Sequence, residues 1–334
     1  MEIAPENVDS NHSKSKPYQI MKLSFKNQFI KNWTSLLLFG FFLSASVSAQ
    51  KPNTDAIERK WLDVPYAKAS RAQKLDIYLP DEGNGPFPVI VSIHGGAFKS
   101  GDKADNQLTP MLEGLKRGYA VVSINYRLSP EAIFPAQIYD VKAAVRWIKA
   151  NARLYKLNQD KIAAWGGSAG GHLSALLGTS GSVLELEDLS MGNPAKSSRI
   201  QAVVDWFGPT DFLKMDTQLK ESKVKNPQIH SIPDSPESEL IGKNLVDAPD
   251  RVRKVNPETY VTSDDPPFFI QHGQIDHLVP YQQSENLASK LISVIGKEKV
   301  TFELLENNDH GGPGFTTEEN LNKVFAFLDQ YLKR

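Results

Sequence analysis

The chain contains no cysteine among its 334 residues. This absence excludes disulfide bonds, thiolate metal sites, a cysteine nucleophile and a lipid-anchor cysteine. An excess of charge of one sign is lacking too, because 38 Lys and Arg residues balance 39 Asp and Glu residues to a net charge of −1. Neither a nucleic-acid-binding protein nor a protein with a polybasic membrane patch is indicated by this balance.

Signatures of nucleotide and metal binding are also missing. Ser168 stands where a Gly-x-Gly-x-x-Gly motif would need its second glycine, and Gly101 is followed by Asp102 instead of the lysine of a P-loop. The seven histidines do not have the spacing of metal ligands. We therefore expect no cofactor and no metal.

Residues 1–49 are interpreted as an N-terminal extension and signal peptide. A lysine-containing segment after Met21 leads into an apolar stretch over 33–43, and small residues follow up to Ala49. This order is typical of a cleaved secretory signal, and translation starts at either Met1 or Met21. A membrane anchor is the alternative, but the stretch is shorter than the ~20 residues of a spanning helix. We expect a secreted or periplasmic protein without a stable membrane anchor after cleavage near Ala49.

Residues 50–334 are predicted to form one α/β catalytic domain, in which a mostly parallel central sheet has helices on both faces. Near-continuous apolar runs indicate strands buried on both sides, whereas the alternation in 75–79 indicates a half-buried strand near the sheet edge. Strands are predicted at 75–79, 88–93, 120–124, 162–165, 202–207, 268–271 and 300–305. Helices are predicted at 136–152, after residue 168, at 287–295 and, behind a capping box that starts at Thr316, at 321–332.

One long segment, 213–258, interrupts this alternation. It is polar, contains prolines and has little periodicity. A loop of this length in a compact domain is usually functional or disordered. The segment is predicted either to cover the active site in part or to form a solvated surface insertion.

Ser168 lies in a Gly-x-Ser-x-Gly pattern between a predicted strand and a predicted helix. This is the pattern of a nucleophile elbow, a turn so tight that only small residues fit two positions on either side of the serine. Gly166 and Gly170 provide that space. A serine becomes a good nucleophile only when a base takes its proton and a third group orients the base.

The order of a triad in such folds is serine, acid, histidine. His310 follows the last predicted strand on a glycine-rich loop and is predicted to be the base. His172 is too close to Ser168 in sequence to serve as base, and His230 is expected at the surface. The predicted acid is Asp276, a few residues past the strand 268–271. Its competitors are Asp264, Asp265 and Asp309, whereas His272 and His277 are expected to shape the turn of the acid.

Amide donors for an oxyanion are expected on both sides of the serine. Ala169 begins the helix that follows Ser168, and its N–H is predicted to be one donor. A glycine-rich loop, 94–103, follows an earlier strand and is predicted to supply a second donor.

Several segments together resemble the hormone-sensitive-lipase-like esterases and their bacterial feruloyl-esterase-like (carbohydrate esterase) branch, which have the α/β-hydrolase fold. The matching segments are 94–96, 125–131, 134–136, the elbow at Ser168, 205–211, the loop of Asp276 and 310–312. The resemblance implies Ser168, Asp276 and His310 as catalytic residues and the N–H groups of Gly96, Ala97 and Ala169 as the oxyanion hole. It also implies Phe98 and Trp206 as substrate-binding residues. Ala97 replaces the third glycine of the family, and its methyl group is expected to narrow the loop.

The sequence therefore predicts an exported serine carboxylesterase that acts through an acyl-enzyme on Ser168. Export and the resemblance suggest short-chain or aromatic acyl esters, such as acetyl or feruloyl groups on plant polysaccharides, as small-molecule or polysaccharide-linked substrates. The alternatives are a formamidase or peptidase with the same triad and a non-catalytic carbohydrate-binding protein with the hydrolase fold.

Overall fold

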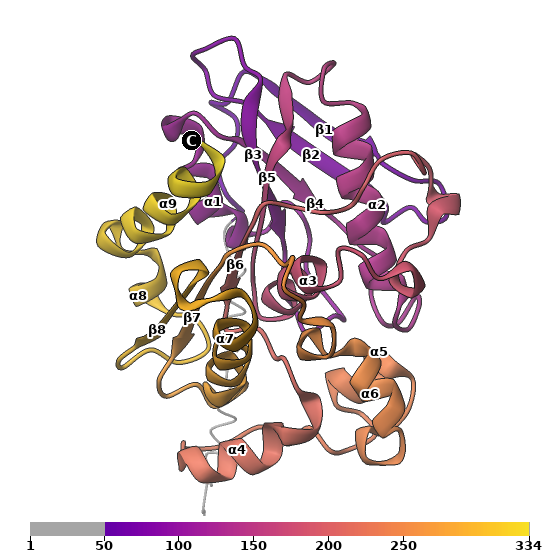
Figure 1. Cartoon of the computed structure of the whole chain (residues 1–334), viewed down its shortest axis with the longest axis vertical. Helices are drawn as coiled ribbons and strands as arrows, with labels where there is room; N and C mark the ends of the chain where they lie inside the picture. The colour runs from indigo at the N-terminus through magenta and orange to yellow at the C-terminus, as the bar shows by residue number, and fades with distance from the viewer. Residues whose placement is uncertain (1–50, 334) are drawn as a thin grey trace, which may run out of the picture. The chain divides into compact units, whose positions relative to one another are not determined.

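The computed structural model describes residues 51–333 (Figure 1). The signal peptide predicted to end near Ala49 lies outside the described residues. In the part of the chain that is described, no helix combines the length and apolar character needed to cross a membrane.

A sheet of eight strands forms the centre of the described domain, with the strand order β1-β2-β4-β3-β5-β6-β7-β8. The strands are β1 (Lys60–Pro65), β2 (Lys74–Tyr78), β3 (Phe87–Ile93), β4 (Ala120–Ile124), β5 (Leu157–Gly167), β6 (Ala202–Trp206), β7 (Phe268–Gly273) and β8 (Val300–Leu305). Pairing is antiparallel for β1 with β2 and for β2 with β4, and parallel from β4 through to β8. The predicted mostly parallel sheet is confirmed.

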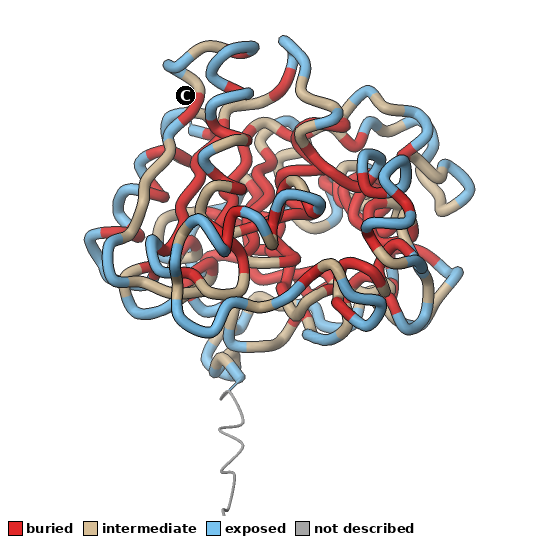
Figure 2. The backbone as a smooth tube through the Cα atoms, turned by 90° about the horizontal axis from the view of Figure 1, so that it is seen from below, coloured by how far each residue is buried: buried red, intermediate tan, exposed pale blue. Residues whose placement is uncertain are grey.

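Helices cover both faces of this sheet (Figure 1). The helices are α1 (Thr109–Leu112), α2 (Ala136–Ala150), α3 (Ala169–Thr179), α4 (Met215–Ser222), α5 (Pro236–Ile241), α6 (Pro249–Val255), α7 (Gln282–Ile295), α8 (Pro313–Thr316) and α9 (Glu318–Leu332). Val89 and Val91 of β3 share a core with residues of α2, α3 and α7, whereas Ile90 shares a second core with residues of α1 and α9. Because side chains alternate across a strand, a strand that serves two cores must be apolar at nearly every position. Figure 2 shows the buried residues concentrated in the interior of the domain.

The edge of the sheet differs from the prediction. The first strand, β1, has mostly exposed side chains, and its register with β2 shifts between Trp61 and Val64, so no apolar alternation marks it in the sequence. Because β1 forms the edge, β2 lies inside the sheet, and its residues from Leu75 to Tyr78 are buried. The strand predicted at 75–79 lies near the edge, as expected, but it is buried and not half-buried, because β1 continues the sheet beyond it.

The cap of the last helix lies one residue later than predicted. Thr316 ends α8, and its hydroxyl donates to the carbonyl of Pro313 (3.3 Å). The side chain of Thr317 instead accepts the N–H of Asn320 (3.2 Å) and caps α9. The predicted capping box at Thr316 is corrected to a cap at Thr317.

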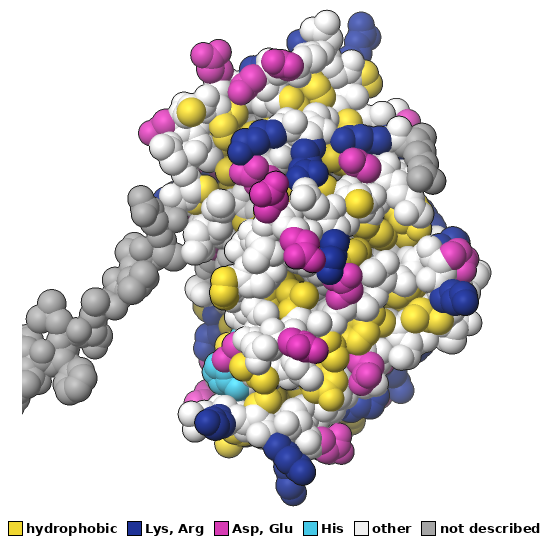
Figure 3. All heavy atoms as spheres, turned by 90° about the vertical axis from the view of Figure 1, so that its left-hand side faces the viewer, with side chains coloured by type: hydrophobic (Ala, Val, Ile, Leu, Met, Phe, Trp, Pro, Cys, Tyr) yellow, Lys and Arg dark blue, Asp and Glu magenta, His cyan; other side chains and the backbone are white. Residues whose placement is uncertain are grey.

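The segment 213–258 contains α4, α5 and α6 (Figure 1). It also contains His230, which is 1% exposed, so the expectation that this histidine lies at the surface was wrong. Two carboxyl groups explain the burial, because Asp216 accepts the His230 backbone N–H (2.7 Å) and Glu237 pairs with the imidazole (2.8 Å). On the face shown in Figure 3, basic and acidic side chains are interspersed, as the net charge of −1 would allow.

Candidate active site

Ser168 lies at the turn between β5 and α3. Its backbone has φ +57° and ψ −124°, a conformation that residues other than glycine adopt rarely. A Cβ on Gly166 would lie 2.4 Å from the carbonyl oxygen of Gly170, and a Cβ on Gly170 would lie 2.0 Å from that of Ile93. The prediction that this turn requires small residues at both positions is confirmed.

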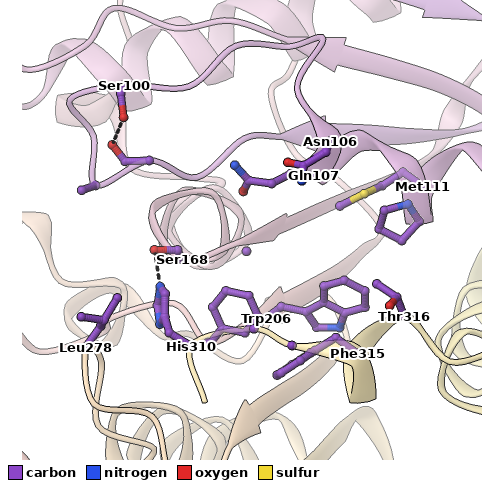
Figure 4. A pocket seen from close by; sticks show the side chains of 17 residues that line it. Ser100, Asn106, Gln107, Met111, Ser168, Trp206, Leu278, His310, Phe315 and Thr316 are labelled. Atoms are coloured by element: carbon purple, nitrogen blue, oxygen red, sulfur yellow. Dashed lines mark hydrogen bonds between the residues drawn. The ribbon is translucent and has the colours of Figure 1, made fainter. Parts of the chain in front are cut away.

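The structure brings Ser168, His310 and Asp276 together although they are far apart in sequence. Nε2 of His310 lies 2.8 Å from Oγ of Ser168 (Figure 4), and Nδ1 of His310 lies 2.7 Å from Oδ2 of Asp276. Ser168 follows β5, Asp276 follows β7 and His310 follows β8. These strands belong to the parallel run β5-β6-β7-β8 of the sheet. Loops after parallel strands meet at one edge of a sheet, and this topology places the three side chains at the same site.

Contacts of the acidic side chains separate Asp276 from its competitors. Besides His310, the Asp276 carboxylate accepts the N–H groups of Leu278 (2.9 Å) and Val279 (2.8 Å). Burial raises the pKa of Asp276, but contacts with His272 and His310 outweigh burial and hold this pKa well below its usual range. From His310, Asp309 accepts the backbone N–H and not the imidazole, and its other partners are the backbone N–H and the imidazole of His277. The other two candidates contact residues outside the site, namely Thr262 and, for Asp264, also Arg199.

The loop after β3 presents two free amides beside Ser168. Gly96 and Ala97 both line the pocket that contains Ser168, and in residues 51–333 neither backbone N–H has a hydrogen-bond partner. A Cβ on Gly96 would lie 2.3 Å from the carbonyl oxygen of Ser100, and its φ is +107°, so this position requires glycine. Ala169 is the first residue of α3, where amides have no acceptor within the helix. All three predicted oxyanion donors are thus located around the serine.

A glutamine that the sequence reasoning missed supports this loop. Oε1 of Gln107 accepts the N–H of Gly95 (2.9 Å), and its Nε2 donates to Asp105 (3.1 Å). On the other side, the ring of Tyr126 stacks on His94 at 4.4 Å between centroids and its hydroxyl donates to the His94 carbonyl (2.9 Å). No motif signals Gln107, because its role depends on a contact across twelve residues of loop.

The pocket in front of Ser168 has a volume of about 610 Å³. Its lining contains no Lys, Arg, Asp or Glu side chain, and His310 is its only titratable group. The lining residues are Gly96, Ala97, Ser100, Asn106, Gln107, Pro110, Met111, Gly167, Ser168, Trp206, Phe207, Leu278, His310, Gly311, Gly312, Phe315 and Thr316 (Figure 4). None of them belongs to 213–258. Within residues 51–333, no cluster of His, Asp and Glu could hold a metal ion.

The two predicted substrate-binding residues have different positions. Trp206 lies in the pocket wall and is 5% exposed. Phe98 is 1% exposed and is absent from the lining, because its ring packs in the core against His172 (5.2 Å between centroids) and Phe212 (6.3 Å). The expectation that Phe98 binds the substrate was wrong. The backbone has φ +55° at Ala97 and +60° at Phe98, and at this turn the side chain of Phe98 packs beneath the loop and not into the pocket.

The segment 213–258 supports the acid loop from behind. His230 pairs through Nδ1 with Glu237, and its Nε2 donates to the carbonyl of Leu278 (2.8 Å). Burial lowers the pKa of His230, but the hydrogen bond and charge of Glu237 outweigh burial and raise it. A histidine with a raised folded-state pKa stabilises the fold fully below its unfolded pKa of about 6.5, and this stabilisation is lost as the pH rises through the folded pKa.

We expect Glu237→Gln to lower the free energy of unfolding by about 1.5–3 kcal/mol at pH 6, because a buried charged hydrogen bond is lost. The difference from the wild type should shrink as the pH rises from 6 to 9, because the imidazole of His230 loses its proton as the pH passes through its folded-state pKa. Urea unfolding at pH 6 and at pH 9 measures this difference in free energy. Glu221→Gln, at an exposed glutamate, is the control. An equal cost at pH 6 and pH 9 would contradict the assignment of a charged His230.

The chain is similar in sequence to curated ester hydrolases. The chain is 34% identical over 259 residues to "Probable carboxylic ester hydrolase LipM" of Mycobacterium tuberculosis (strain ATCC 25618 / H37Rv), with 74% of this chain and 55% of the relative covered. Esterase LipQ of the same organism is 32% identical, with 74% and 56% covered. The chain thus spans about half the length of the curated relatives it matches.

The chain is also similar to solved structures of carbohydrate esterases, and it matches the model of one protein family. A truncated carbohydrate esterase from gut microbiota is 34% identical, with a TM-score of 0.75 and with 85% of this chain and 100% of that chain covered. A bifunctional GH43-CE protein of Bacteroides eggerthii is 37% identical, with a TM-score of 0.72 and with 81% and 35% covered. The model of the BD-FAE family matches residues 75–291, more than half of the chain. With the sheet order, the elbow and the arrangement around Ser168, this match shows that the chain belongs to the BD-FAE family and has the α/β-hydrolase fold.

Proposed function

We propose that the protein is a serine carboxylesterase that forms an acyl-enzyme on Ser168. The observation that carries this proposal is the line of two hydrogen bonds from Ser168 through His310 to Asp276, located in the wall of an uncharged pocket. A hydroxyl, an imidazole and a carboxylate in this order are suited to acyl transfer. Relatives described as ester hydrolases and as a carbohydrate esterase support the same activity.

Acylation follows from the geometry. Oγ of Ser168 attacks the ester carbonyl while Nε2 of His310 takes its proton, and the buried Asp276 carboxylate stabilises the imidazolium that forms. Negative charge develops on the carbonyl oxygen, where the free amides of Gly96, Ala97 and Ala169 can donate to it. His310 then protonates the leaving alcohol, and the acyl group remains on Ser168.

Deacylation uses the same groups in the second half of the cycle. A water molecule loses a proton to His310 as it attacks the acyl carbonyl, the same amides stabilise the second oxyanion, and the acid leaves as Ser168 regains its proton. The neutral lining, with apolar walls at Met111, Trp206 and Phe315, favours uncharged acyl groups. We propose short-chain or aromatic acyl esters as substrates, free or linked to a polysaccharide.

A panel of esters tests the activity. We expect release of p-nitrophenol from p-nitrophenyl acetate and butyrate, and product from methyl ferulate or acetylated xylan if the acyl group is aromatic or acetyl. p-Nitroacetanilide, an amide, serves as the matched control for amidase chemistry. Failure to hydrolyse any ester would refute the proposal, and preferential cleavage of the amide would replace it with an amidase.

The pocket predicts a length dependence. Thr316 is an exposed residue of the wall that lies well apart from Ser168 in Figure 4. Thr316→Trp should fill the distant part of the pocket without disturbing the core, and should lower kcat/KM for p-nitrophenyl octanoate about tenfold or more. The value for p-nitrophenyl acetate should change little and is the internal control. Equal losses for both esters would show that acyl chains do not extend in this direction.

We also propose that the protein is exported and processed near Ala49. The support is the order of charged, apolar and small residues over 21–49. Expression of the full chain in a bacterial host, followed by N-terminal sequencing of the periplasmic fraction, tests this. A protein that retains the apolar stretch and stays with the membrane would contradict it.

A further inference from the structure

The carboxylate of Asp276 is held on both of its oxygens. Oδ1 accepts the N–H groups of Leu278 and Val279. Oδ2 accepts from His310 at 2.7 Å and also lies 3.2 Å from Nε2 of His272. The side chains of Asp276 and His272 have no solvent exposure, so water does not replace these donors.

His272 reaches this carboxylate from inside β7. Its Nε2 lies 2.9 Å from the carbonyl oxygen of Val279, and its Nδ1 lies 2.7 Å from Oγ of Ser284 on α7. The two oxygens that face Nε2 are acceptors only, so Nε2 must carry a proton. The hydroxyl of Ser284 can then donate to Nδ1, and these partners assign the Nε2–H tautomer.

These contacts form a closed ring that does not include the base. The ring runs from Oδ1 of Asp276 to the N–H of Val279, and from the carbonyl of Val279 through Nε2 of His272 back to Oδ2 of Asp276. Because Oδ1 and Oδ2 are restrained from different sides, the plane of the carboxylate is fixed before His310 docks on it. Orientation established in advance is a large part of what makes such sites effective.

We propose that His272 is a positioning residue for the hydrolysis, whose Nε2–H aims the Asp276 carboxylate at Nδ1 of His310. This inference rests on the proposed esterase function. His272 does not line the pocket and does not contact Ser168. Its effect should therefore appear in kcat, with little change in KM.

A pair of amide variants tests the role of this one nitrogen. His272→Gln carries an N–H donor near the position of Nε2, whereas His272→Asn carries the same amide near the position of Nδ1. For p-nitrophenyl acetate we expect kcat of His272→Asn to fall about 10–100-fold, the range found when a hydrogen-bond partner that orients a metal-binding side chain is removed. KM should stay nearly unchanged, and His272→Gln should recover most of kcat. Equal values of kcat for the two variants, or a change confined to KM, would overturn the proposal.

Titration of the nucleophile separates positioning from folding. Diethyl p-nitrophenyl phosphate reacts with an activated serine, so it counts competent sites and reports how fast each one reacts. We expect His272→Asn to have slower labelling per site with the full number of sites. If instead fewer sites react, each at the wild-type rate, the role of His272 is structural and the proposal fails.

Two further measurements keep the outcome decisive. The imidazole nitrogens of wild-type His272 can be observed by NMR, and we expect the Nε2–H tautomer; an Nδ1–H tautomer would overturn the proposal even if the variants do not fold. Wild type and Ser168→Ala are assayed alongside the variants. Activity that survives Ser168→Ala refutes the proposed function, whereas an active wild type with an equally active His272→Asn refutes only the role of His272.

Discussion

Ser168→Ala is expected to lower kcat for p-nitrophenyl acetate by a factor on the order of 10⁶, as removal of the nucleophile does in serine hydrolases. Among residues 51–333, the hydroxyl of Ser168 is the only one that contacts His310, and it lies at the turn between β5 and α3. Alanine fits this turn as serine does, because the close contacts there involve Gly166 and Gly170. The variant should therefore fold normally, with an unchanged unfolding curve.

A matched control is available on the same helix. The hydroxyl of Ser174 is buried and donates to the carbonyl of Gly170 (2.7 Å), away from the pocket lining. Ser174→Ala should retain activity although it loses a buried hydrogen bond. If Ser168→Ala kept more than about one hundredth of the wild-type kcat, another nucleophile would have to be sought.

Asp276→Asn is expected to lower kcat about 10⁴-fold with little change in KM. The N–H groups of Leu278 and Val279 require an acceptor, so the amide oxygen should take the place of Oδ1. The amide NH₂ would then face Nδ1 of His310. Nδ1 can accept a hydrogen bond from this NH₂ only when Nδ1 itself carries no proton. The proton would move to Nε2, and His310 could no longer take the proton of Ser168.

Asp309→Asn is the control for this variant, because Asp309 pairs with His277 and contacts the backbone N–H of His310 but not its imidazole. A larger loss in Asp309→Asn than in Asp276→Asn would show that Asp309 is the acid.

The pH dependence of stability provides a second comparison. Because the folded-state pKa of Asp276 is below its unfolded value of about 3.9, ionised Asp276 stabilises the fold above that pH, and this stabilisation is lost as the pH falls further.

The central strands could be predicted from sequence because burial on both faces leaves a local mark. β3 and β4 are near-continuous apolar runs, and the structure pairs them in parallel with Ile90 beside Val121. β1 has no such mark, since an edge strand with exposed side chains needs no pattern. Without β1, the strand β2 was expected to be half-buried near the edge, whereas it lies second from the edge and is buried.

The same contrast applies to the candidate site. The glycines around Ser168 are required by contacts within a few residues, so the elbow is visible in the sequence. Phe98 stood next to the predicted oxyanion donors and was expected in the pocket, but its ring packs against His172 and Phe212. Which way a side chain turns from a loop depends on the space beneath the loop, and no local pattern encodes that space.

The sequence by itself determined the class of fold and marked Ser168 as the candidate nucleophile, because hydrophobic runs and tight turns are local properties. The order of serine, acid and histidine can be read directly along the chain. Only the tertiary structure decided which carboxylate meets Nδ1 of His310, that His230 is buried behind the acid loop and that His272 contacts Asp276. These outcomes depend on burial and on hydrogen bonds between loops that are distant in sequence. A buried polar group must form hydrogen bonds, and only the folded structure shows which partners are close enough.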